Sequence, residues 1–196
     1  TSSGETVAEA AAVLMRCGYG RSKMTVLEHL GGAKERIVNV TPEGAAGQSF
    51  ASLNTLAIEC GDGPDALFTG TGPGLPDSAF EHDGQLTKRE VRAVTMAALQ
   101  PFPGALLWDI GAGCGSISIE FMRAARGARA LSIEDMPARR TIIEANAVKL
   151  GVPELVLVKG RAPAALKGLE TPDAVFIGGG ITRDAVFDTA FAALKP

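Results

Sequence analysis

Several kinds of residue are scarce in this chain of 196 residues, and each shortage argues against a class of protein. Only three cysteines are present, widely spaced and without a CxxC pair, and the chain has two histidines. We therefore expect no disulfide framework and no metal site, and a reducing, cytoplasmic setting is the default. No hydrophobic run approaches the ~18 residues that cross a membrane, and no secretory leader is expected, so we predict no membrane partner.

Aromatic side chains make up only 5% of the chain, whereas 46% of its residues are hydrophobic and the net charge is −3. This composition is that of a folded domain rather than a disordered segment. The charge is uneven, because residues 1–83 carry −6 and residues 84–196 carry +3. The second part is too weakly basic to be a nucleic-acid footprint, so a small anionic partner fits it better.

A stretch dense in glycine and proline, residues 61–74, divides the chain and is predicted to be a linker. Before it, Thr6 and Glu9 have the spacing of a helix capping box, with Met15 among the hydrophobic residues at helical spacing. Three strands are predicted after this helix, over 24–30, 36–40 and 53–60. One helix and three strands are too little for a self-sufficient domain, so residues 1–60 are interpreted as the end of an α/β domain.

Residues 75–196 alternate strictly between strand and helix patterns. Their first helix is predicted to open on a capping box, Thr87 and Glu90, with Val91, Val94 and Ala98 on its apolar face. Strands are predicted over 105–110, 129–134, 155–159 and 174–177, followed in turn by helices over 116–125, 139–150, 162–169 and 183–194. This order predicts an α/β fold, a doubly wound, Rossmann-like parallel sheet.

The sharpest motif is the run from Leu107 to Ser116, LWDIGAGCGS, in which a glycine turn follows a short apolar strand. Such a turn lets a ligand approach the backbone at the start of the next helix. Three interpretations compete: a site for the methyl donor S-adenosylmethionine, a dinucleotide site, and a tight strand–helix junction with no ligand. The GxGxG spacing and Asp109, an acid that suits the donor's cationic amino-acid end, favour the first.

Three further strand ends carry candidate residues. Glu134 closes the second strand, where an acid can bind both ribose hydroxyls of an adenosine-containing ligand. Arg161, after the third strand, either stacks on the base or is solvated. Small residues after the fourth strand, Gly178 and Gly179, leave room for a methyl acceptor or simply form a loop. A non-catalytic nucleotide-binding module and an NAD(P)-dependent Rossmann enzyme remain the alternatives to a methyltransferase.

Three segments together resemble the family of precorrin-6Y C5,15-methyltransferases (decarboxylating): residues 74–92, the glycine motif of residues 108–116, and residues 160–163. Residues 25–37 resemble the last part of that family's N-terminal tetrapyrrole-methylase domain. The resemblance implies a bifunctional enzyme of cobalamin biosynthesis. Its second domain, here 75–196, would methylate carbon 15 of a precorrin and remove the carbon-12 acetate carboxyl, while the other domain methylates carbon 5. The cofactor implied is S-adenosyl-L-methionine, with S-adenosyl-L-homocysteine as product.

The resemblance also assigns residues. It implies donor contacts from Thr87, the glycine turn, Glu134 and, near the adenine, Ala162, whereas Arg161 departs from the acid common in related methyltransferases. The turn comprises Gly111, Ala112, Gly113, Cys114 and Gly115. Cys114 is predicted to be a small buried thiol rather than a nucleophile.

Further residues are candidates for substrate binding and for proton transfer. A polycarboxylate precorrin would suit basic residues on the first helix after the linker, Lys88, Arg89 and Arg92, for which a solvated basic face is the equal alternative. His82 is a weak candidate for a proton donor, with a solvated polar turn favoured over it.

The resemblance further implies a homo-oligomer, of which a tetramer is one form. Related folds continue past the fourth helix into further strands, so we expect a fold incomplete at its C-terminus, a longer functional unit, and poor folding of residues 1–196 alone. Phe187, Phe191 and Leu194 are expected to pack against that continuation.

Overall fold

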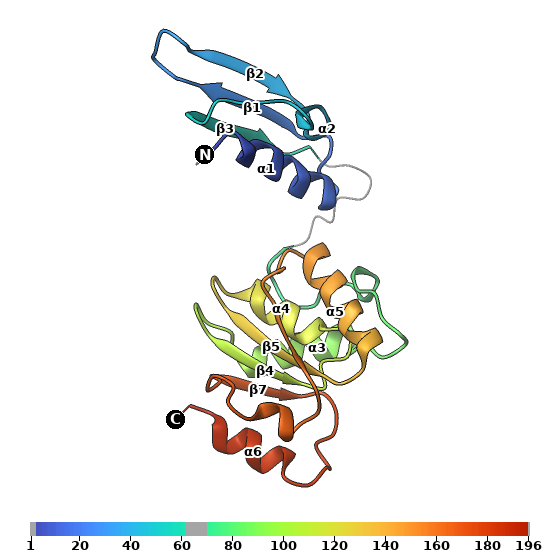
Figure 1. Ribbon diagram of the computed structural model, residues 1–196. Helices are drawn as coiled ribbons and strands as arrows, with labels where there is room; N and C mark the ends of the chain where they lie inside the picture. Colours follow the sequence, from blue (N-terminus) through green and yellow to red (C-terminus); the bar gives the residue numbers. More distant parts are fainter. Residues whose placement is uncertain (1–2, 62–69, 196) are drawn as a thin grey trace. The chain divides into compact units, whose positions relative to one another are not determined.

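The computed structural model describes residues 3–61 and 70–195, which belong to two compact units, residues 1–68 and 69–196 (Figure 1). Each unit is described by itself. Most of the predicted linker, residues 62–69, lies outside the described residues. The assignment of residues 1–60 to a tetrapyrrole-methylase domain stays a prediction.

The first unit is a three-stranded antiparallel sheet with one long helix against it. Its elements are α1 (Glu5–Arg16), β1 (Lys23–Glu28), β2 (Arg36–Val40), α2 (Pro42–Ala45) and β3 (Asn54–Glu59). The strand order is β2-β1-β3. The core forms where Val7 and Ala11 of α1 meet Met24 and Val26 of β1, because these positions recur at helical and at strand spacing. The predicted helix and three strands are confirmed, and the short helix α2 is additional.

The start of α1 differs from the prediction. The helix begins at Glu5, and its N-cap residue Gly4 makes no side-chain capping bond, so the predicted capping box at Thr6 is wrong. Thr6 lies inside the first turn, where its hydroxyl is 3.3 Å from that of Ser3. Met15, predicted on the apolar face, is 47% exposed.

The second unit contains a four-stranded parallel sheet. Its elements are η1 (Asp77–Ala79), α3 (Arg89–Leu99), β4 (Leu106–Ile110), α4 (Ser116–Ala124), β5 (Arg129–Glu134), α5 (Pro137–Lys149), β6 (Val156–Lys159), η2 (Ala164–Leu166), β7 (Ala174–Ile177) and α6 (Val186–Ala193). The strand order is β6-β5-β4-β7, so the winding reverses at β4. All four predicted strands are present within one or two residues.

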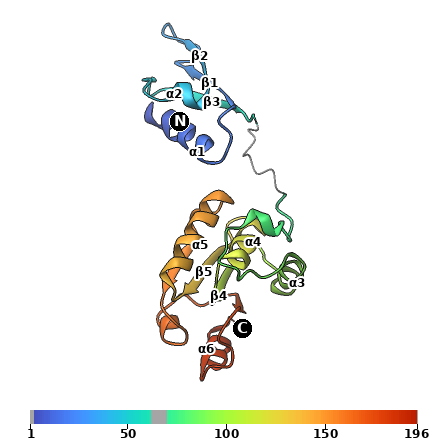
Figure 2. The same ribbon diagram turned by 90° about the vertical axis from the view of Figure 1, so that its right-hand side faces the viewer.

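Helices cover both faces of this sheet, as a doubly wound fold requires (Figures 1 and 2). One face, with Trp108 and Ile110 of β4 and Ile133 of β5, packs against η2 and α6. The other face meets α4, whose Ser118 hydrogen-bonds to Asp109. α3 and α5 contact α4. Every residue of β4 is buried, which explains why this strand is a continuous apolar run broken only by one acid.

Helix α3 presents a different face from the one predicted. Lys88 is its N-cap and makes no side-chain capping bond, so the capping box at Thr87 is wrong. Val91 and Val94 are 55% and 70% exposed, whereas Arg92 and Met96 are buried. The reason is that the Arg92 guanidinium, by bonding to a buried carboxylate on α4, fixes the rotation of the helix.

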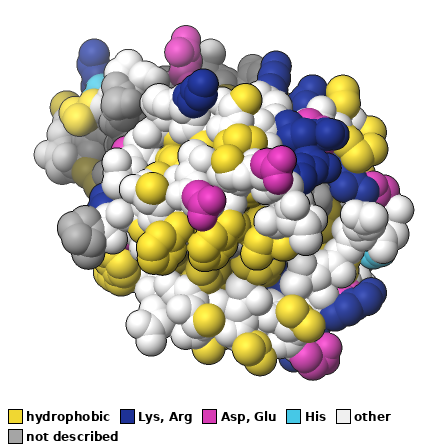
Figure 3. Space-filling view, turned by 90° about the horizontal axis from the view of Figure 1, so that it is seen from below, with side chains coloured by type: hydrophobic (Ala, Val, Ile, Leu, Met, Phe, Trp, Pro, Cys, Tyr) yellow, Lys and Arg dark blue, Asp and Glu magenta, His cyan; other side chains and the backbone are white. Residues whose placement is uncertain are grey.

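The last two predicted helices are shorter than expected. Residues 162–169 contain only the single turn η2, and α6 starts at Val186. On α6, Val186 and Ala190 are buried while Phe187 and Phe191 are 52% and 66% exposed, with ring centroids 5.8 Å apart. A row of hydrophobic side chains also crosses the face seen in Figure 3. This exposure agrees with the expectation that Phe187 and Phe191 pack against further strands, and that packing stays a prediction.

Candidate active site

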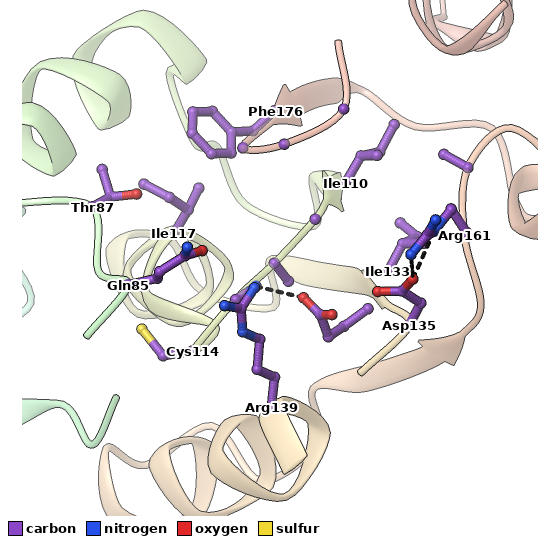
Figure 4. A pocket seen from close by; sticks show the side chains of 18 of the residues that line it. Gln85, Thr87, Ile110, Cys114, Ile117, Ile133, Asp135, Arg139, Arg161 and Phe176 are labelled. Carbon is purple, nitrogen blue, oxygen red and sulfur yellow. Dashed lines mark hydrogen bonds and ion pairs between the residues drawn. The ribbon is translucent and has the colours of Figure 1, made fainter. Parts of the chain in front are cut away.

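A cavity of about 480 Å³ lies at the carboxyl ends of the four parallel strands, beside β4, where the winding reverses (Figure 4). Open α/β sheets bind ligands at this switch point because the loops diverge to either side there. The structure brings nine of the predicted site residues to its lining: Thr87, Gly111, Ala112, Gly113, Cys114, Glu134, Ala162, Gly178 and Gly179.

The glycine turn after β4 has glycine at three positions that share a backbone conformation but differ in their surroundings. All three have positive φ, +75° at Gly111, +62° at Gly113 and +79° at Gly115, which L side chains rarely adopt. A Cβ at Gly111 would lie 3.0 Å from the backbone nitrogen of Gly179, and one at Gly115 would lie 3.0 Å from Ile143. A Cβ at Gly113 would meet nothing within 4 Å. The backbone at Gly113 is therefore open to the cavity.

Glu134, at the end of β5, is held against this turn. One carboxylate oxygen accepts a hydrogen bond from the backbone N–H of Gly113 at 3.0 Å, and the other accepts one from Met136 at 2.9 Å. The residue is 4% exposed. Each carboxylate oxygen can accept a second hydrogen bond, so the side chain remains able to bind a hydroxyl in the cavity.

Asp109 is placed differently from its neighbours in the motif. It does not line the cavity, and one of its oxygens accepts hydrogen bonds from the N–H and hydroxyl of Ser118, at 3.2 and 2.7 Å. The other oxygen is buried and has no hydrogen-bond partner among the described residues. Burial raises the pKa of Asp109 to about 6. A contact between Asp109 and the donor stays a prediction.

Arg161 has a side chain that is 61% exposed, which agrees with the solvated alternative, and stacking on a base stays a prediction. Its guanidinium pairs with Asp135, with a distance of 2.6 Å from Nε to Oδ2, and both residues line the cavity (Figure 4). The hydrogen bond from Arg161 is the main reason that the pKa of Asp135 lies below its usual value. Sequence reasoning missed Asp135, although it directly follows Glu134 at the strand end.

The basic residues predicted to grip a substrate are turned elsewhere. Arg92 is fully buried: its Nε donates to Glu120 and its Nη1 to Asp77, both at 2.8 Å. The prediction that Arg92 binds substrate is wrong, because its guanidinium is enclosed by protein groups. Lys88 is exposed and 3.6 Å from Asp77, and it does not line the cavity.

His82 and Arg89 are also outside the cavity lining. His82 is exposed, and its Nδ1 accepts a hydrogen bond from the backbone N–H of Gly84 at 3.1 Å. Arg89 donates from Nε to the Gly74 carbonyl at 2.8 Å. The solvated polar turn is thus the better interpretation of His82. Within the part of the chain that the structure describes, no cluster of three or more potential ligands could hold a metal ion.

Asn146 is a structural residue of the site that the sequence reasoning missed. Its fully buried amide donates to the carbonyls of Glu81 and Cys114, at 2.9 and 3.0 Å, and accepts from the Glu81 N–H at 2.9 Å. It thereby ties the segment before α3 to the glycine turn. A polar residue between Ile143 and Ala147 on the predicted apolar face of α5 was the available signal. Burial raises the pKa of the Cys114 thiol, as expected of an inert packing residue.

A doubly wound parallel sheet, with a glycine turn after its first strand and an acid closing its second, has the Rossmann-like fold of S-adenosylmethionine-dependent methyltransferases. Residues 78–196 match the family model described as the precorrin methyltransferase domain. The chain belongs to the precorrin methyltransferase family, and the predicted resemblance is confirmed. None of the helices in the described residues is long and apolar enough to span a membrane.

Two relatives illustrate how the chain aligns with that family. A precorrin-6Y C(5,15)-methyltransferase [decarboxylating] of Sinorhizobium sp. is 48% identical over 195 residues, which is 100% of this chain and 47% of the relative. The crystal structure of the C-terminal domain of precorrin-6Y C5,15-methyltransferase from Rhodobacter capsulatus is also 48% identical. It matches with a TM-score of 0.61, over 65% of this chain and 68% of that one. The chain thus spans about half the length of the curated relatives it matches.

Proposed function

We propose that the second unit binds S-adenosylmethionine in the strand-end cavity and uses it to methylate a carbon of a precorrin. The observation that carries this proposal is the meeting of Gly113 and Glu134 in one cavity at the switch point of the sheet. The names of the relatives support carbon 15 as the position, with loss of a carboxyl group. In the whole protein, which we propose is longer, the other domain methylates carbon 5.

The residues present fit the proposed donor. The open backbone at Gly113 offers room for a ligand that lies close against the turn, and the spare lone pairs of Glu134 suit the two hydroxyls of a ribose. Thr87 and Ala162 line the same cavity from the segment before α3 and the loop after β6. The chemistry that bound S-adenosylmethionine supplies is an electrophilic methyl group on sulfur.

The work left to the protein is positioning. Holding two reactants in line converts a bimolecular step into an effectively unimolecular one, which is worth ~7–11 kcal/mol in favourable cases. In this cavity the ion pairs Arg161–Asp135 and Arg139–Asp83 join neighbouring segments of the wall. Cys114 and Ile117 contribute apolar surface to the cavity lining. Such a mechanism needs no nucleophilic side chain.

Two measurements on the full-length protein test the proposal. Calorimetric titration is expected to show binding of S-adenosylhomocysteine and weaker binding, or none, of NAD. Incubation with S-adenosylmethionine and a precorrin-6 substrate is expected to give a methylated, decarboxylated product by mass spectrometry. Donor binding without turnover would favour the non-catalytic nucleotide-binding module, and tighter binding of NAD would overturn the cofactor assignment.

The proposal includes self-association. We propose that the full-length protein is a homo-oligomer, with a tetramer as the expected form. Light scattering during size-exclusion chromatography measures its mass directly, and a monomer at micromolar concentration would contradict this part of the proposal without affecting the cofactor assignment.

A further inference from the structure

One cation of the cavity has no partner among the residues that the structure describes. Of the charged side chains that line the cavity, Arg161 pairs with Asp135, Arg139 pairs with Asp83, and Glu134 accepts two backbone hydrogen bonds. Arg183 also lines the cavity, and no hydrogen bond or ion pair of its side chain occurs among the described residues. A guanidinium at the wall of a pocket, left free of acids, is available to an anion that enters it.

The position of Arg183 separates it from the acids. β5 and β6 lie on one side of β4 and β7 lies on the other, so the loop after β7 forms the opposite half of the cavity from Glu134 and Asp135. Figure 4 shows this division, with Phe176 of β7 across the cavity from Asp135 and Arg161. The acid-bearing half suits the hydroxyls of a ribose. The half after β7 carries a positive charge and three glycines.

Gly180, in this loop, allows the side chain of Arg183 to lie close to the backbone. Gly180 has φ +81°, and a Cβ there would lie 3.4–3.6 Å from the Cδ, Nε and Cζ atoms of Arg183. The end of this side chain therefore lies close to the backbone at Gly180, while Arg183 as a whole is exposed. Packing of this kind limits the conformations of the side chain, which lowers the entropic cost of ordering it around a ligand.

We propose that Arg183 binds a carboxylate of the methyl acceptor and so positions the acceptor opposite the donor. The inference rests on the proposed function. Relatives whose names include "decarboxylating" act on substrates that bear carboxyl groups, and arginine pairs with a carboxylate through two parallel hydrogen bonds. The donor also has a carboxylate, in its amino-acid end, so the experiment must distinguish the two anions.

The variant Arg183→Gln in the full-length protein shows whether Arg183 binds the carboxylate of the acceptor or that of the donor. We expect KM for the precorrin acceptor to rise ~10- to 100-fold, as for loss of a charge-assisted hydrogen bond, while kcat changes less than about threefold. The dissociation constant of S-adenosylhomocysteine stays within about twofold of the parent. Arg183→Lys, which keeps the charge, recovers part of the KM. Arg126→Gln is the matched control, because Arg126 is exposed after α4 and does not line the cavity.

An acceptor whose carboxyl groups are all methyl esters gives a second readout. With this acceptor the KM values of the parent and Arg183→Gln are expected to agree, since the anion is gone from both. A KM unchanged by Arg183→Gln with the free acid overturns the inference, and so does weakened S-adenosylhomocysteine binding, which would assign Arg183 to the donor. Absence of methylation in the parent overturns the proposed function instead, so the two failures are distinguishable.

Discussion

The carboxylate of Glu134 lies 3.0 Å from the backbone nitrogen of Gly113, so the end of β5 is tied to the glycine turn that follows β4. Together with hydrogen bonds from the Gly111 and Ala112 N–H groups to the Ile133 carbonyl, this bond joins two strand ends at the reversal of the sheet. It holds the acid at the floor of the cavity while each of its oxygens keeps one lone pair for a ligand. Substitutions at these two residues therefore test the proposed donor site directly.

Replacement of Glu134 by alanine is expected to weaken binding of S-adenosylhomocysteine. A charge-assisted hydrogen bond to a ribose hydroxyl is worth roughly 1.5–3 kcal/mol, so Kd is expected to rise about ten- to hundredfold by calorimetry. Glu134→Gln is the matched control, since it keeps an acceptor for the Gly113 N–H but loses the charge, and an intermediate Kd is expected. Unchanged affinity in Glu134→Ala would show that the acid does not contact the ligand.

Gly113→Ala is expected to cost both stability and binding. At φ +62° an L side chain costs roughly 1–2 kcal/mol, and the added Cβ projects into open space in the cavity. Gly104→Ala is a close control, because Gly104 has φ +79°, a Cβ added there would meet nothing within 4 Å, and the residue does not line the cavity.

Thermal denaturation is expected to show similar losses of stability in the two alanine variants. Calorimetry is expected to show weaker S-adenosylhomocysteine binding in Gly113→Ala alone. Equal binding by both would mean that no ligand lies against the turn.

Arg92→Met is expected to destabilise the second unit by about 3–5 kcal/mol, since it leaves the carboxylate of Glu120 buried without its cation. Lys88→Met is the control, because Lys88 meets the same Asp77 from a side chain that is 66% exposed, and its loss is expected to cost less than about 0.5 kcal/mol. Chemical denaturation measures both. Equal small effects would show that the buried network contributes little.

Asp109 is expected to make stability depend on pH. Its pKa in the folded protein, about 6, lies above the usual 3.8, so between these values the folded state holds more protons than the unfolded state. The free energy of unfolding therefore falls as pH rises from about 4 to about 6, by an amount on the order of 3 kcal/mol. The free energy of unfolding of Asp109→Asn does not fall in this way. The variant is therefore expected to become more stable relative to the parent as the pH rises from about 4 to about 6.

Unfolding can be followed by the fluorescence of Trp108, which is the single tryptophan of the chain and lies in β4. Denaturation of the parent and of Asp109→Asn at pH 4, 5, 6 and 7 gives the difference between their free energies of unfolding. The contributions of other titrating groups cancel in this difference. A difference independent of pH would show that Asp109 titrates at its ordinary pKa in the folded protein.

The regular alternation of apolar strands and helices was readable in the sequence because the central strands β4 and β5 are largely buried and glycines follow β4, β6 and β7. The buried face of helix α3 could not be read from the sequence, because its buried positions are set by an ion pair. The pattern of Val91 and Val94 indicated one apolar face, but the carboxylate of Glu120, 28 residues beyond Arg92, drew the opposite face inward. A pairing over that distance leaves no local signal.

The sequence by itself determined the parallel fold, the glycine turn and the acid at the end of β5, since these depend on residue type and spacing within one βα unit. Only the tertiary structure decided which charges face the cavity. It turned Arg92 inward, paired Arg161 with Asp135, and left Arg183 unpaired on the far side of β4 among the described residues. The physical reason is that charge pairing depends on distances between different helices, strands and loops, which spacing along the chain does not fix.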